Sequence, residues 1–162
     1  MFSSKPTTQQ VVWYTLFIHL GVMIGFEVLF SWLQVSDAFT WSFVAYFALY
    51  LVLRRGVARH HRAGMSAAAH AENFEQAMQH FQDSYDFFSR HLWIDKGRYL
   101  FLLSCSKPCY RELALVNIGS CLVQMGRGKE AIVAFERALQ EFPDSELAKQ
   151  TMNTIRTFSA AM

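Results

Sequence analysis

A long apolar stretch, residues 11–35, constrains this chain more than any other feature of its sequence. It contains a single charged residue, Glu27. At about 1.5 Å of rise per residue, a helix of this length is longer than the roughly 30 Å hydrocarbon core of a bilayer. The sequence therefore predicts a transmembrane helix over residues 11–35, preceded by a short N-terminal tail, residues 1–10.

A second apolar stretch, residues 39–53, has no charged residue but is shorter. Extended to residues 36–58, it can form a short spanning helix if Arg54 and Arg55 reach toward the headgroups along their aliphatic stems. A cleaved signal peptide is the alternative for the first stretch. Signal peptides usually have apolar regions of about 7–15 residues, and here a second apolar stretch follows directly. We therefore expect a two-helix transmembrane hairpin.

The distribution of basic residues predicts the topology of this hairpin. Its short connection has no Lys or Arg, whereas four arginines follow the second stretch: Arg54, Arg55, Arg59 and Arg62. The positive-inside rule places this basic segment, and with it both termini, in the cytoplasm. Residues 59–71 are expected to form a basic juxtamembrane linker, and recognition of an anionic lipid is a second interpretation of its charge. The remaining chain is slightly acidic, so we expect the lipid bilayer as a partner and no nucleic acid.

Two different faces are expected on the first transmembrane helix. Polar or polarisable side chains recur at a spacing of four, at Thr15, His19, Met23, Glu27 and Ser31. Roughly opposite lie Gly21 and Gly25, a G-x-x-x-G pair that allows a second helix to approach closely. An ionisable group in lipid costs several kcal/mol, so Glu27 should be protonated, paired, or turned toward protein or water.

The second helix can cover only one of these faces. Its own polar row, Ser42, Tyr46 and Tyr50, could hydrogen-bond to the row that contains Glu27. In that arrangement the glycine face stays open. If the second helix packs on the glycines instead, Glu27 needs another partner. Either arrangement predicts a homo-oligomer or a larger membrane complex.

The periodicity changes to that of amphipathic soluble helices in residues 72–162. Apolar side chains recur there at spacings of three and four. Pro108 suits the first turn of a helix that continues to about Met125, and Asp144 or Ser145 can cap the last helix. The expected helices are residues 72–90, a broken short helical stretch near residues 94–104, residues 108–125, residues 129–141 and residues 146–158.

Residues 113–143 carry a spaced pattern of large and small apolar residues. Its positions are Leu115, Ile118, Gly119, Leu122, Ala131, Phe135, Ala138 and Pro143. The pattern resembles a tetratricopeptide repeat, a helix-turn-helix unit of 34 residues, with Leu115 and Leu122 replacing the family's Trp and Tyr. An earlier partial match, at Ala77, Phe81 and Ser84, has the spacing of a repeat's second helix. The whole arrangement looks like small bacterial membrane proteins of this repeat class, which implies the bacterial inner membrane.

The resemblance implies an all-α fold in which the transmembrane hairpin is followed by stacked helix pairs. One repeat cannot bury its own apolar face, so residues 72–90 and 146–158 must supply its neighbours. In this family the first helix of each pair lines a concave surface, which places Asn117, Ser120 and Gln124 on that side. Such surfaces hold an extended peptide or a partner's helix. The resemblance therefore implies protein binding and no catalysis.

Residue types that bind metals or cofactors do not form a recognisable motif. The three cysteines are expected as free thiols, because Cys105 and Cys109 have no second ligand pair at zinc-site spacing. Of the six histidines, only His19 lies in an expected membrane helix, and haem would require a second axial ligand. Nucleotide loops and hydrolase motifs are missing from the sequence. We therefore expect no catalytic residue, metal or cofactor.

Three hypotheses follow from the sequence. The first is a membrane-anchored adaptor or assembly factor whose concave surface binds other proteins. The second is an accessory subunit of a multi-subunit membrane complex, bound mainly through its transmembrane faces. The third is a membrane enzyme or transport component that uses Glu27 and His19.

Overall fold

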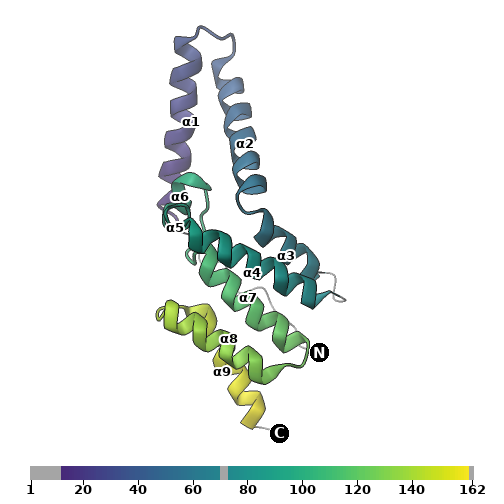
Figure 1. Ribbon diagram of the computed structural model, residues 1–162. Coiled ribbons are helices and arrows are strands. Elements are labelled where there is room, and N and C mark those ends of the chain that lie inside the picture. Colours follow the sequence, from purple (N-terminus) through teal and green to yellow (C-terminus); the bar gives the residue numbers. More distant parts are fainter. Residues whose placement is uncertain (1–11, 70–72, 161–162) are drawn as a thin grey trace.

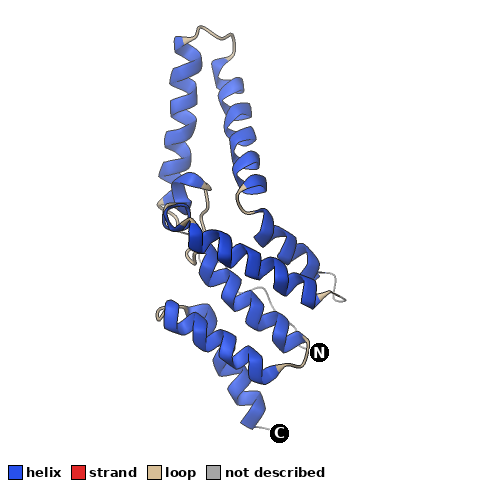
Figure 2. Cartoon of the chain, viewed as in Figure 1, coloured by secondary structure: helices blue, strands red, loops and turns tan. Residues whose placement is uncertain are grey.

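The structure, a computed structural model, describes residues 12–69 and 73–160 (Figure 1). Every regular element in this part of the chain is a helix, as the sequence predicted (Figure 2). Two long helices project from one end of a stack of shorter ones. The chain thus divides into a hairpin and a helical domain.

Helices α1 (Thr15–Trp32) and α2 (Ala38–Gly56) form the projecting hairpin. Among the described helices, only α1 is long and apolar enough to cross a membrane by length and composition, a test that signal sequences and buried core helices also pass. Arg54 and Arg55, in the last turn of α2, lower the hydropathy of that helix. A transmembrane role for the pair therefore stays a prediction.

Helix α3 (Arg59–Ala69) follows α2 almost directly and packs against α4 (Phe74–Arg90). The sequence predicted a linker over residues 59–71, and the structure instead has a helix over residues 59–69. The two helices approach closely at Gly64, where an added Cβ would lie 2.8 Å from the ring of Phe81. Phe81 is only 1% exposed, so its ring has no room to move away from Gly64. This contact therefore fixes how the two helices cross.

The second helix pair consists of α7 (Tyr110–Gln124) and α8 (Gly128–Glu141). A Cβ at Gly119 would lie 2.6 Å from the Phe135 ring, so this pair crosses through the same kind of contact as α3 and α4. Gly126 joins the helices with a φ of 74°, which an L side chain rarely adopts. The contact at Gly119 is the one that the repeat pattern predicted.

Helix α9 (Glu146–Ala160) packs against α8 and closes the stack. Its first turn is capped as the sequence predicted, because the Ser145 hydroxyl accepts a hydrogen bond from the Ala148 N–H at 3.2 Å. Helix α4 packs on α3 and α7, and α7 packs on α8. The stack therefore consists of two helix pairs, α3–α4 and α7–α8, followed by the single helix α9. The core between them is built from Phe81, Leu115, Leu122 and Phe135, together with smaller residues.

Two short helices, α5 (Leu92–Lys96) and α6 (Arg98–Phe101), connect α4 to α7 near the foot of α1. Asp95 in α5 is only 3% exposed, and its carboxylate accepts the N–H of Tyr110 at 2.8 Å. It thereby caps α7 from a distant part of the chain. Pro108 was expected in the first turn of α7, but the helix begins two residues later, at Tyr110.

Candidate binding groove

A large groove runs along the helical domain and continues to the foot of the hairpin. It has a volume of about 1690 Å³. Residues of α1 and α2 and residues 102–108 line it near the hairpin, and its remaining length is lined mainly by residues of α3, α7 and the start of α9. These are the first helices of the two pairs and the single helix that follows them. The lining contributed by the three helices includes His61, Arg62, Met65, Leu113, Val116, Asn117, Ser120, Leu147 and Gln150.

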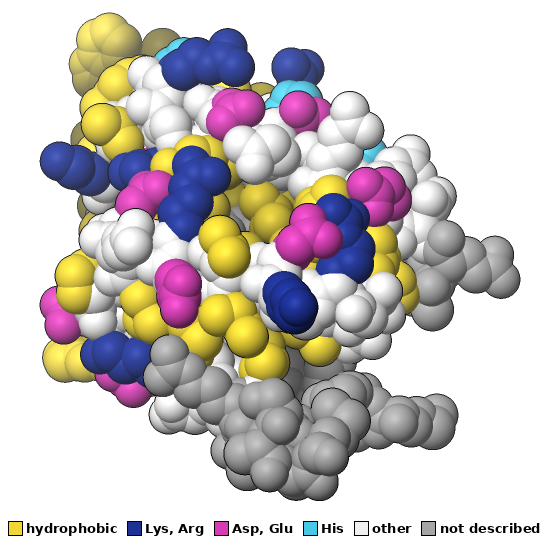
Figure 3. Space-filling model, turned by 60° about the horizontal axis from the view of Figure 1, so that its bottom comes forward, with side chains coloured by type: hydrophobic (Ala, Val, Ile, Leu, Met, Phe, Trp, Pro, Cys, Tyr) yellow, Lys and Arg dark blue, Asp and Glu magenta, His cyan; other side chains and the backbone are white. Residues whose placement is uncertain are grey.

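Charge is unevenly distributed along the groove. Arg54 and Arg62 line it at the end formed by α2 and α3, whereas Asp144 and Glu146 line it at the start of α9. Glu141, also in the lining, is already paired with Arg111 and Arg137. Figure 3 shows one face of the molecule, on which basic and acidic side chains are interspersed with hydrophobic ones. The groove therefore has a basic end and an acidic end, and Lys107 and Glu112 line it together with the apolar side chains.

The three residues expected on the concave side have different positions. Asn117 lines the groove, and its amide nitrogen lies 3.8 Å from the Met65 sulfur across it. Ser120 also lines the groove, but its hydroxyl donates to the Val116 carbonyl of its own helix at 2.9 Å. Gln124, the last residue of α7, is exposed and is not among the lining residues.

His61 forms part of the wall of the groove and is itself buried. Its ring packs edge-on against Phe81 and Tyr110, with centroids 5.4 Å and 5.3 Å away. Burial lowers the pKa of His61 to about 4, so the ring is neutral at physiological pH. Sequence reasoning assigned this residue to a solvated linker and missed its role in packing.

Within the hairpin, α2 covers the polar row of α1. The Ser42 hydroxyl donates to the Glu27 carboxylate at 3.0 Å, and His19 Nδ1 lies 2.6 Å from the Tyr46 hydroxyl. His19 Nε2 lies 3.3 Å from the sulfur of Cys105, which follows α6. This is the first of the two arrangements considered from the sequence.

The glycine face of α1 is open in this arrangement. A Cβ added at Gly21 or Gly25 would meet no atom within 4 Å. Large apolar side chains on the same side of the helix, including Phe17, Ile24 and Val28, are exposed. This face therefore lacks a partner within the described part of the chain.

The four juxtamembrane arginines are divided between two surfaces. Arg54 stacks over the ring of Tyr50 and bonds to its hydroxyl, and it also lines the groove. Arg55 and Arg59 lie with Arg62 around a shallow hollow of about 360 Å³ at the foot of α2. Because α3 is helical, Arg59 and Arg62, three residues apart, lie on one face of it, and Arg55 reaches the same hollow from the last turn of α2.

Residues 113–145, which include most of α7 and all of α8 and end just before α9, match a family model described as the tetratricopeptide repeat. This segment is similar to a tetratricopeptide repeat. No curated protein and no solved structure matches the chain. The repeat identified by the family model thus supplies the central wall of the groove.

The α3–α4 pair has the same key contact as this repeat. Gly64, Ala77 and Phe81 echo Gly119, Ala131 and Phe135, with one extra residue between the glycine and the alanine. The spacing from Ala77 to Phe81 equals the spacing from Ala131 to Phe135. This repeated spacing, with a glycine upstream in each case, was the signal that could have identified α3 from the sequence.

Proposed function

We propose that the protein is a membrane-anchored adaptor or assembly factor of the tetratricopeptide-repeat type. Its hairpin fixes the helical domain at the cytoplasmic face of a membrane, the bacterial inner membrane, with both termini in the cytoplasm. Its groove holds an extended segment or a helix of a partner protein. The observation that carries this proposal is the continuous groove formed by α3, α7 and α9, the helices that line the concave side of such stacks.

The dimensions and chemistry of the groove favour a peptide over a small molecule. Small-molecule pockets usually measure about 300–1000 Å³, and this groove, at about 1690 Å³, is larger. Met65, Leu113 and Val116 offer apolar contacts between the basic and acidic ends. A segment with an apolar centre, acidic residues at one end and basic residues at the other would complement it.

The surface of the hairpin supports the anchoring role. Most of the large exposed apolar side chains of the described chain lie on α1, α2 and their connection, a surface much larger than soluble monomers usually expose. Exposed Trp93, Leu100 and Phe101 lie in α5 and α6, near the foot of α1, where Tyr14 packs on Tyr99 with centroids 5.8 Å apart. Aromatic side chains at that level suit the membrane interface.

The arginine hollow at the foot of α2 supports the same orientation. The cytoplasmic leaflet is rich in anionic lipids, which attract basic side chains close to the membrane. Arg55, Arg59 and Arg62 are well placed for that attraction if α2 spans the bilayer. Lipid contact of this kind is part of the proposal.

An accessory subunit of a larger membrane complex is the second candidate. The open glycine face of α1 favours it, because close-packing helices in membranes use such faces. A second copy of the chain or another membrane protein would fill it. For Glu27 and His19 we propose a structural role, since their bonds to α2 hold the hairpin together.

Affinity purification of the full chain in mild detergent, followed by mass spectrometry, separates these candidates. The groove variant Asn117→Arg/Ser120→Arg places two large side chains in the groove. Gln124→Arg is its control, because it adds one arginine, where the groove variant adds two, to the same helix outside the groove. For an adaptor, the groove variant loses partners that the control retains.

A third variant, Gly21→Ile/Gly25→Ile, tests the subunit candidate. Loss of a stoichiometric membrane complex in this variant, together with its retention in the groove variant, would identify the protein as a subunit. If wild type and all three variants recover the same proteins, neither the groove nor the glycine face binds them.

A further inference from the structure

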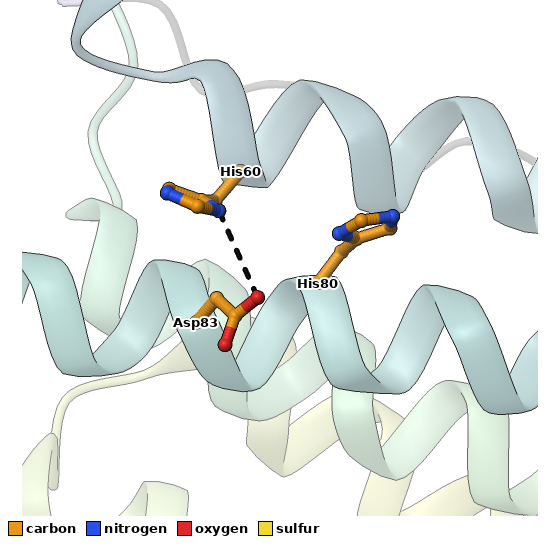
Figure 4. A group of neighbouring side chains, drawn as sticks. All are labelled: His60, His80 and Asp83. Atoms are coloured by element: carbon orange, nitrogen blue, oxygen red, sulfur yellow. Dashed lines mark ion pairs between the residues drawn. The ribbon is translucent and has the colours of Figure 1, made fainter.

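Three side chains with metal-binding atoms converge between α3 and α4. One ligand atom from each of His60, His80 and Asp83 lies within 4.8 Å of the others. His60 Nδ1 and an Asp83 carboxylate oxygen are 3.8 Å apart. Figure 4 shows the two imidazoles and the carboxylate grouped in the space between the two helices.

The fold holds these residues together through its core. His80 and Asp83 are three residues apart on α4 and so share one face of that helix. His60 comes from the facing helix, α3, one turn before Gly64. The close contact between Gly64 and Phe81 fixes the crossing of the helices, and with it the distance between His60 and the α4 pair.

One imidazole in this group has an unsatisfied buried nitrogen. His80 Nδ1 is shielded from solvent and has no hydrogen-bond partner among the described residues. Leaving a buried polar atom unpaired destabilises the folded state. A bound cation would satisfy this nitrogen. This observation is independent of the spacing of the three side chains.

We propose that His60, His80 and Asp83 bind a divalent transition-metal ion of the zinc class. Two imidazoles and a carboxylate are ligands that such ions prefer, and water or a side chain of a bound partner completes the coordination. Bonds of about 2.0–2.2 Å in a tetrahedron place ligand atoms roughly 3.3–3.5 Å apart. The ligand atoms, which lie within 4.8 Å of one another, must therefore approach by up to about 1.5 Å.

The exposed ligands have room for this adjustment. The side chains of His60 and Asp83 are 31% and 50% exposed, so both can rotate toward the buried nitrogen of His80. Arg59 opposes binding, because its Nε donates to His60 Nε2 at 3.2 Å. A His60 ring that binds metal through Nδ1 carries its proton on Nε2, so Arg59 must turn away. Arg59→Ala should therefore tighten binding.

A metal at this position would clamp the helix that connects the hairpin to the helical domain. Helix α3 follows α2 after only Val57 and Ala58, and the ion would join α3 to α4. The clamp would thus restrain the angle between the membrane hairpin and the groove. It does not depend on the proposed function of the groove.

Zinc titration of the full chain in detergent, stripped beforehand with EDTA, tests the site. Calorimetry should show one equivalent of zinc bound, and cobalt should give the visible spectrum of a tetrahedral site. His80→Ala and Asp83→Ala should each weaken zinc binding at least 10-fold. His91→Ala, which removes a histidine bonded to the Phe87 carbonyl, should leave the affinity unchanged.

The free thiols are the main competing ligands, and two of them are poorly suited. Burial raises the pKa of Cys109 to about 12 and that of Cys121 to about 11, so both stay protonated. Cys105 is the remaining thiol, and its contribution is tested by replacement. If the proposed site holds the metal, Cys105→Ser should retain zinc binding. Helix content measured by circular dichroism identifies any variant that fails to fold, and His80→Gln replaces His80→Ala in that case.

Two results would overturn the proposal. One is the absence of zinc binding to the folded wild-type chain at 100-fold excess of metal. The other is undiminished affinity in the triple variant His60→Ala/His80→Ala/Asp83→Ala. As a second readout, zinc should raise the Tm of the wild type and leave that of the triple variant unchanged.

Discussion

Replacement of Gly64 by alanine tests whether α3 and α4 form a repeat-like pair. The new Cβ would lie 2.8 Å from two atoms of the Phe81 ring and 3.0 Å from a third. Phe81 is fully buried in the core and has no solvent-facing space into which its ring can turn. The substitution must therefore push the helices apart or force the ring out of its preferred rotamer.

Two opposing effects determine the size of the change. Overpacking a core typically costs about 1–3 kcal/mol, whereas alanine in place of glycine within a helix gains up to about 1 kcal/mol. We expect the free energy of unfolding to fall by about 1–2 kcal/mol. For a cooperative unit of roughly 100 residues, each kcal/mol corresponds to a Tm decrease of about 4–8 °C.

Thermal unfolding of the full chain in detergent, followed by circular dichroism, measures this decrease. Gly128→Ala is the control, because a Cβ at this helical glycine would meet no atom within 4 Å. It should leave Tm unchanged or raise it slightly. Gly119→Ala should behave like Gly64→Ala, since its Cβ would lie 2.6 Å from the Phe135 ring.

A double-mutant cycle makes the test specific to the contact. In a Phe81→Leu background the ring is gone, so adding Gly64→Ala should cost little or should stabilise the chain. If Gly64→Ala is as stable as wild type, or costs the same in both backgrounds, the close crossing of α3 and α4 is refuted.

Three further predictions follow from other contacts. Asp95→Ala removes the acceptor for the Tyr110 N–H and should lower the free energy of unfolding by about 1–3 kcal/mol, whereas an unchanged denaturation midpoint would show that Asp95 does not cap α7. His61 is buried with a pKa of about 4, below the roughly 6.5 of an unfolded chain, so stability is retained above pH 6.5 and falls as the pH drops toward 4. Between pH 7 and 5 the metal-free wild type should lose about 2 kcal/mol more than His61→Leu, and equal losses would contradict this. In a variant that keeps Trp93 as its sole tryptophan, brominated lipids should quench its fluorescence if α5 lies at the membrane interface, and unquenched fluorescence would remove α5 from the membrane.

The repeat at residues 113–143 could be predicted because its structure depends on a few residues at fixed spacing. Gly119 and Phe135 are a small residue and a large one that must meet where the helices cross. The family match at residues 113–145 and the structure agree with that prediction. Boundaries set by local chemistry were also predictable, such as the cap at Ser145.

Helix α3 was not predicted, because its inner face lacks the large apolar side chains by which amphipathic helices are usually identified. Its inner face is built from small residues, among them Gly64, Ala67 and Ala68, which let α4 approach closely. With charged side chains on the other face, such a segment looks like a solvated linker. Only comparison with the second pair, through Gly64 and Phe81, reveals its role.

The sequence indicated part of the candidate groove but not the group of metal-binding side chains. Of the three residues that family register places on the concave side, Asn117 and Ser120 line the groove, whereas Gln124 at the end of α7 does not; their role in partner binding stays a prediction. The grouping of His60 with His80 and Asp83 depends on the packing of α3 against α4. It could not be inferred while α3 was interpreted as a linker.

Site-specific photocrosslinking in native membranes tests the central claim, that the groove holds a segment of a partner protein. A photoreactive amino acid is placed at Asn117 within the groove and, as a control, at Gln124 outside it. The account predicts a discrete crosslinked partner from position 117 that is missing from position 124. Equal crosslinking from both positions, or none from position 117, would contradict it.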